Sequence, residues 1–141
     1  MAHAPETPPS AGRPRENLER ILLVEDDPDI RLIASTALEG LGGFVVATAG
    51  SGREALELAS DFVPDLILLD IMLPEMDGPT TLLALRELPA LRTTPVIFLT
   101  ARVFSSDLEQ YKLLGALAVI GKPFDPLTLA EEVERLWYAR P

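Results

Sequence analysis

The sequence predicts a doubly wound α/β domain, in which helices cover both faces of a parallel five-stranded sheet. Two observations support this fold class. Short apolar runs alternate five times with stretches of helical periodicity, and such alternation is typical of strand–helix–strand units with right-handed crossovers. The 141 residues are enough for one domain of this kind. The expected architecture is a three-layer sandwich with strand order 2-1-3-4-5.

Five short apolar runs are the expected strands. Unbroken apolar runs of this length are typical of strands that are covered on both faces, as in parallel sheets. They lie at residues 21–24, 44–47, 66–69, 95–99 and 116–120. We therefore expect all five strands in the interior of the domain.

Helices are expected after each strand, because apolar residues recur there every three or four positions. In the first helix, the buried stripe is expected to include Ile33 and Leu41. The helical stretches cover residues 28–41, 51–62, 79–86 and 106–114, with a last one carrying Leu129, Val133, Leu136 and Trp137. Capping signals mark four helix starts. These signals are Asp27 before Pro28, Asp125 before Pro126, and two capping boxes, Ser51 with Glu54 and Ser106 with Glu109.

The composition excludes several kinds of site. A formal charge of -10 speaks against nucleic acid as a partner. There is no cysteine, and the only histidine, His3, lies in a proline-rich segment (residues 1–19) that is expected to be disordered. A catalytic triad and a histidine-ligated zinc site are therefore not expected. No stretch has the apolar length of a secretory signal or membrane span, so we expect a cytoplasmic protein without membrane contact.

Polar residues follow four of the five strands, at the sheet edge where ligands bind in this fold class. They are Glu25 and Asp26 after the first strand, Asp70 after the third, Thr100 after the fourth and Lys122 after the fifth. Each has an ordinary alternative role, as a helix or turn cap or as a solvated loop charge. In the order 2-1-3-4-5 the first and third strands are neighbours, so the three acids are expected to lie together, with the hydroxyl and the ammonium nearby.

Three crowded carboxylates repel one another unless their pKa values rise or a cation joins them. With only oxygen ligands at hand, Mg²⁺ is the expected cation and Mn²⁺ a substitute. Such an ion also neutralises an incoming phosphoryl group, whose oxygens Lys122 and Thr100 could contact. Asp70 is then the expected nucleophile, because carboxylates can form acyl phosphates.

Four motifs resemble the receiver domain of two-component response regulators, the flavodoxin-like domain of the chemotaxis-regulator type. The motifs are ILLVEDDP at 21–28, DLILLDIMLP at 65–74, PVIFLTA at 95–101 and KPF at 122–124. The resemblance extends from about Arg20 to Trp137, so we expect the receiver domain over residues 20–138. It implies that Asp70 is the phosphoacceptor and that Asp26, Asp70 and the backbone carbonyl of Met72 bind Mg²⁺.

The same resemblance implies roles for the remaining site residues. Glu25 would contribute to the metal site through water, and Thr100 and Lys122 would contact the phosphoryl group. The peptide bond between Lys122 and Pro123 is expected to be cis. One position departs from the family's usual pattern, because Val119 stands where a Tyr or Phe commonly moves inward on phosphorylation. The usual switch is therefore in doubt, whereas the phosphorylation chemistry is not.

By this resemblance the chain is a signalling phosphoacceptor and not an enzyme acting on a separate substrate. Its donor would be a histidine kinase or a histidine phosphotransfer protein. The sequence after Trp137 is too short for an output domain, so output is expected through contact with a downstream protein. The chain would be a monomer or a weak, phosphorylation-dependent dimer.

Two alternatives remain open from the sequence. A pseudo-receiver would keep the fold and act only as an interaction module, without being phosphorylated. A Mg²⁺-dependent phosphatase of the haloacid-dehalogenase type also uses an aspartyl phosphate, but such enzymes need a second Asp two residues after the nucleophile. Met72 occupies that position here and removes the general acid.

Overall fold

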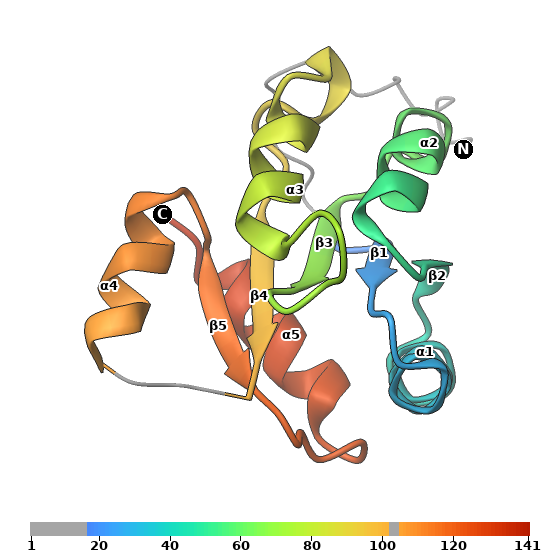
Figure 1. Cartoon of the computed structure of the whole chain (residues 1–141). Helices are drawn as coiled ribbons and strands as arrows, with labels where there is room; N and C mark the ends of the chain where they lie inside the picture. Colours follow the sequence, from blue (N-terminus) through green and yellow to red (C-terminus); the bar gives the residue numbers. More distant parts are fainter. Residues whose placement is uncertain (1–16, 102–104) are drawn as a thin grey trace.

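The computed structural model describes residues 17–101 and 105–141, which form one parallel sheet between two layers of helices (Figure 1). The strand order β2-β1-β3-β4-β5 confirms the predicted fold class. Within the described residues, no helix is long and apolar enough to cross a membrane. The strands are β1 (Arg20–Val24), β2 (Val45–Ala49), β3 (Leu66–Asp70), β4 (Val96–Thr100) and β5 (Ala118–Gly121). The helices are α1 (Pro28–Gly42), α2 (Gly52–Phe62), α3 (Gly78–Arg86), the short 3-10 helix η1 (Pro89–Leu91), α4 (Ser105–Leu113) and α5 (Leu129–Tyr138).

Two apolar layers hold the helices to the sheet, because side chains along each strand alternate between its faces. On one face, Leu68 of β3 belongs to a cluster with Leu38 of α1 and Val133 of α5. On the opposite face, Leu69 belongs to a cluster with Leu82 of α3. All five residues of β3 are buried. The central strand is thus covered on both sides, as its sequence predicted.

Helix α1 begins as predicted and ends one residue later, but its buried stripe is narrower. Asp27 accepts hydrogen bonds from two amides of the first turn, and Gly43 follows the helix with a left-handed φ of 71°. Ile33 and Leu41, both expected in the core, are 48% and 60% exposed. Ile33 lies about 100° around the helix from the buried Ala34, and Leu41 lies in the last turn, where its side chain remains open to solvent.

Two of the predicted helix caps need correction. The Ser51 hydroxyl accepts a hydrogen bond from the Glu54 amide at 3.1 Å, but the Glu54 carboxylate accepts one from Gly50 at 2.6 Å. Only half of the predicted capping box therefore forms. Asp125 does not cap α5, which starts four residues further along the chain. Its carboxylate instead accepts a hydrogen bond from the Leu127 amide at 2.9 Å, in the turn before the helix.

Several boundaries differ from the predicted ones by one or two residues. β2 and β5 begin after Phe44 and Ala116, which are buried but precede the strands. An apolar run marks burial, and the strand itself is the part that pairs with a neighbour. Leu18 was predicted to lie in the disordered tail over residues 1–19, yet it is buried in the core and its amide donates to the Tyr138 hydroxyl at 3.3 Å. Residues 1–16 lie outside the described part of the chain.

Candidate functional site

The register of the sheet brings two of the predicted acids together. Val24 of β1 pairs with Leu69 of β3 in parallel register. The residues that follow them, Glu25 and Asp70, therefore lie side by side at the carboxyl edge of the sheet. Glu25 and Asp70 are each 1% exposed. Two carboxylates that are withdrawn from water need a compensating positive charge.

The next two strands supply a hydroxyl and an ammonium to the same edge. Asp70 pairs with Leu99 of β4, so Thr100 is the following residue on the neighbouring strand. Thr100 in turn pairs with Gly121 of β5, and Lys122 comes directly after it. Thr100 is 2% exposed at the end of β4. Parallel pairing thus places all of these residues at one edge, as the sequence predicted.

A carboxylate cluster lies at the centre of this edge. Carboxylate oxygens of Glu25, Asp26 and Asp70 lie within 4.8 Å of one another. Asp26 is exposed, whereas the other two acids are buried. The cluster therefore combines two buried carboxylates with one that is accessible from solvent.

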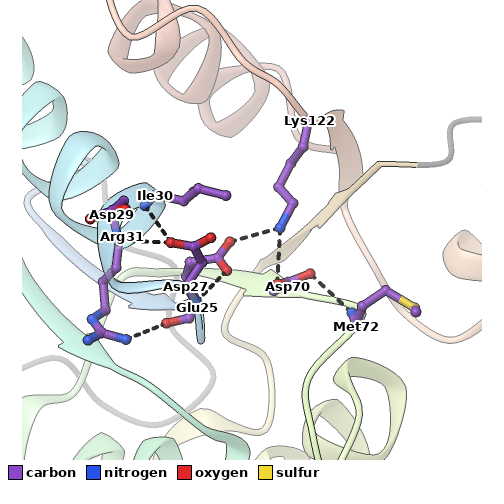
Figure 2. Close-up of polar contacts among 8 residues, drawn as sticks. All are labelled: Glu25, Asp27, Asp29, Ile30, Arg31, Asp70, Met72 and Lys122. Atoms are coloured by element: carbon purple, nitrogen blue, oxygen red, sulfur yellow. Dashed lines mark hydrogen bonds and ion pairs between the residues drawn. The ribbon is translucent and has the colours of Figure 1, made fainter.

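Lys122 joins the two buried acids (Figure 2). Its Nζ donates to Glu25 Oε1 at 2.9 Å and to Asp70 Oδ2 at 3.1 Å. Burial raises the pKa of Glu25, although hydrogen bonds from the Asp27 amide and from Lys122 oppose this shift. Burial pulls the pKa of Lys122 down, but its hydrogen bonds to the two carboxylates outweigh that effect and the net shift is upward. Lys122 therefore remains a cation in this site.

The loop after β3 fixes the second oxygen of Asp70. The amide of Met72 donates to Asp70 Oδ1 at 3.0 Å. The Met72 side chain is 71% exposed and points away from the acids (Figure 2). The peptide bond between Lys122 and Pro123 is cis, which confirms that prediction. Binding of a metal by the Met72 carbonyl stays a prediction.

Val119 lies in β5, paired with Phe98 of β4. It is half-buried and packs against the same apolar cluster as Tyr111 of α4. The Tyr111 ring meets the Phe98 ring edge-on, with centroids 5.4 Å apart. Aromatic packing next to β5 is thus supplied by α4 and β4, and position 119 contributes only a small branched side chain.

Arg31 of α1 also reaches the site, although its sequence position did not single it out. Its Nη1 donates to the main-chain carbonyl of Glu25 at 2.8 Å (Figure 2). The available signal was an arginine four residues after the N-cap Asp27, one helical turn from the acids. Arginine is common on helix surfaces, so this spacing is too weak a signal without the fold.

The family model of the response regulator receiver domain matches residues 21–134. The chain belongs to this family. This receiver domain is 39% identical over 116 residues to response regulator Rre1 of Synechocystis, covering 82% of this chain and 50% of Rre1. It is 38% identical over 121 residues to an uncharacterized 14.6 kDa protein of Leptolyngbya boryana, covering 86% of this chain and 92% of that protein.

Solved structures agree with the sequence comparison. The receiver domain superimposes on the chemotaxis protein CheY4 of Vibrio cholerae with a TM-score of 0.79 at 32% identity, covering 85% of this chain and 99% of that one. The chain therefore spans half the length of Rre1 and nearly all of CheY4. The pseudo-receiver and phosphatase alternatives are not favoured, because the family is a signalling family and the site residues lie together.

The donor set of the receiver domain fits a hard divalent cation. All the clustered ligand atoms of Glu25, Asp26 and Asp70 are carboxylate oxygens, the type that Mg²⁺ prefers. Lys122 offsets only one of these negative charges. Asp26 is exposed, so one of the three carboxylates is accessible from solvent. Mg²⁺ keeps several waters, so it needs few protein ligands.

Proposed function

We propose that this receiver domain is a phosphoacceptor, in which the carboxylate of Asp70 receives a phosphoryl group from a phosphohistidine. The donor would be a histidine kinase or a histidine phosphotransfer protein. The observation that carries the proposal is the position of Asp70, which lies 3.1 Å from the Lys122 ammonium and within 4.8 Å of Glu25 and Asp26. A buried carboxylate beside an ammonium group and a cluster of acids that would hold a cation is suited to an anionic phosphoryl group.

In the transfer step, an oxygen of Asp70 attacks phosphorus, an O–P bond forms and the P–N bond to the donor imidazole breaks. The leaving imidazole takes a proton from solvent. Lys122 moves with the charge from the carboxylate to the phosphoryl oxygens, and the Thr100 hydroxyl donates to one of them. Mg²⁺ or Mn²⁺, held by Asp26, Asp70, the Met72 carbonyl and Glu25 through water, would supply charge neutralisation for the phosphoryl oxygens.

Removal of the phosphoryl group follows the same geometry. Water attacks phosphorus, the O–P bond to Asp70 breaks, and inorganic phosphate leaves. The chain returns to a free carboxylate that Lys122 contacts again. After one cycle the protein is therefore chemically unchanged, as a reversible switch requires.

Phosphorylation would act as a switch through local charge. A phosphoryl group adds roughly 1.5 to 2 negative charges and three acceptor oxygens. Charge-assisted hydrogen bonds contribute about 1.5–3 kcal/mol each, so two or three of them match the roughly 5.5 kcal/mol that a nearly complete population shift needs. Lys122 and Thr100 are the side chains that would carry this signal from Asp70. Output would pass to a downstream protein by contact, with the chain as a monomer or a weak phosphorylation-dependent dimer.

The test is direct phosphorylation by a small donor. Phosphoramidate carries the same kind of P–N bond as phosphohistidine, and incubation with MgCl₂ should add the mass of one phosphoryl group to the wild type. The adduct should survive acid and decay in alkali, and it should not form when EDTA replaces MgCl₂. Asp70→Asn should abolish it, whereas the control Asp29→Asn, an exposed acid of the first α1 turn, should retain it. A wild type without an adduct would overturn the proposal, and steady turnover of a phosphate ester would favour a phosphatase.

A further inference from the structure

Arg31 contacts the main chain of Glu25, one of the three clustered acids. Its Nη1 donates to the Glu25 carbonyl oxygen at 2.8 Å, from the side opposite to Lys122 (Figure 2). Lys122 binds the carboxylate of the same residue at 2.9 Å. Glu25 is therefore fixed at its main chain by one cation and at its side chain by another.

Gly50 provides the space for this guanidinium. The Glu25 amide donates to the Ala49 carbonyl at 3.0 Å, which brings the loop after β2 beside the loop after β1. A Cβ added at Gly50 would lie 3.0 Å from Arg31 Nη1, closer than ordinary van der Waals contact. The Gly50 amide is itself held by the Glu54 carboxylate at 2.6 Å. The Arg31 guanidinium can thus contact the Glu25 carbonyl because Gly50, which lies beside it, has no side chain.

The hydrogen bond from Arg31 acts on the peptide unit that carries the second acid. The Glu25 carbonyl and the Asp26 amide belong to one planar peptide group. A hydrogen bond that fixes the carbonyl therefore also fixes the orientation of the Asp26 amide, and with it the direction of the Asp26 side chain. Asp26 is exposed, and packing alone does not hold it. The next amide, of Asp27, donates to Glu25 Oε2 at 3.0 Å. Rotation of the peptide group between Glu25 and Asp26 would therefore shift the carboxylates of both residues.

We propose that Arg31 is a positioning residue for the cation site, which orients the Glu25–Asp26 peptide so that both carboxylates face Asp70. The inference rests on the proposed metal site of the receiver domain. Arg31 does not touch the cation or the phosphoryl group in this account. It acts only through the main chain of Glu25, with the loop at Gly50 as its support.

Positioning and charge predict opposite results when Arg31 is removed. The positive charge of a guanidinium repels a divalent cation, so loss of that charge alone would strengthen cation binding. Loss of positioning would weaken binding instead. Outer-shell groups that orient metal ligands typically change metal affinity by about 10- to 100-fold. The direction of the change therefore separates the two roles.

The experiment measures Mn²⁺ affinity of the full chain by electron paramagnetic resonance of the free ion. Arg31→Ala is expected to bind Mn²⁺ about tenfold more weakly than the wild type. Gly50→Ala, which pushes the guanidinium by a few tenths of an ångström, should weaken binding in the same direction but less. The double variant should bind no more weakly than Arg31→Ala. The matched control Arg53→Ala removes an exposed arginine of α2 and should bind at least as tightly as the wild type.

A second readout follows the loop without metal. Amide hydrogen exchange at Asp26 and Asp27 should be faster in Arg31→Ala and unchanged in Arg53→Ala. Equal or tighter Mn²⁺ binding by Arg31→Ala, or unchanged exchange, would overturn the inference and leave the proposed function intact. A wild type that binds no Mn²⁺ would overturn both. If Arg31→Ala does not fold, Gly50→Ala decides by the same criteria.

Discussion

Gly78, the first residue of α3, lies against the main chain of the proposed phosphoacceptor. A Cβ added at this position would be 2.6 Å from the Asp70 carbonyl oxygen and 2.7 Å from Ile71 Cα. The Gly78 amide also donates to the Ile71 carbonyl at 2.9 Å. Backbone atoms of β3 cannot rotate away as a side chain could. We therefore expect Gly78→Ala to push the β3–α3 loop away from Asp70.

The size of the effect follows from these distances. Non-bonded heavy atoms rest at about 3.5 Å, so the backbones at Gly78 and Asp70 must separate by roughly 0.9 Å. Overpacking of this kind costs about 1–3 kcal/mol of unfolding free energy. A misplacement of about 1 Å at a reacting group can cost about 100-fold in rate. Since Asp70 moves with its backbone, phosphorylation of Gly78→Ala should be about tenfold slower or worse.

Urea denaturation and the rate of phosphorylation by phosphoramidate at saturating MgCl₂ would measure the two effects. Gly40→Ala is the matched control, because Gly40 lies on the exposed side of α1 and a Cβ there meets no atom within 4 Å. That variant should be more stable by about 0.5–1 kcal/mol, with an unchanged rate. Wild-type stability and rate in Gly78→Ala would refute the reasoning, because they would show that this close approach constrains neither the fold nor Asp70.

Three further substitutions test the site and the caps. Lys122→Met leaves Glu25 and Asp70 buried without their ammonium, so in EDTA the variant should lose about 1–3 kcal/mol of unfolding free energy. MgCl₂ should raise the melting temperature of the variant more than that of the wild type. Equal melting temperatures of the two proteins in EDTA would contradict this prediction. Asp27→Ala removes the α1 cap and should cost about 1 kcal/mol in urea denaturation. Asp125→Ala, which caps no helix, should cost clearly less, and a larger loss at Asp125 would show that the turn before α5 is the more important contact.

The sequence by itself determined the sheet and the composition of the site. A strand in the centre of a parallel sheet is covered on both faces, so its apolar residues must be contiguous, and β3 shows this pattern directly. Parallel strands end at the same edge of the sheet, so the residues that follow them all lie along that edge. For this reason Glu25, Asp70 and Lys122 could be assigned to one site before their distances were known.

The tertiary structure decided the features that depend on contacts between loops and helices. Whether Ile33 is buried depends on what covers its side of α1, and whether Asp125 caps α5 depends on where the preceding turn ends. The contact of Arg31 with the Glu25 carbonyl requires a gap at Gly50, on a different loop. Periodicity and spacing describe one segment at a time. The distance between two segments is set by how all of them pack, and only the folded chain contains that information.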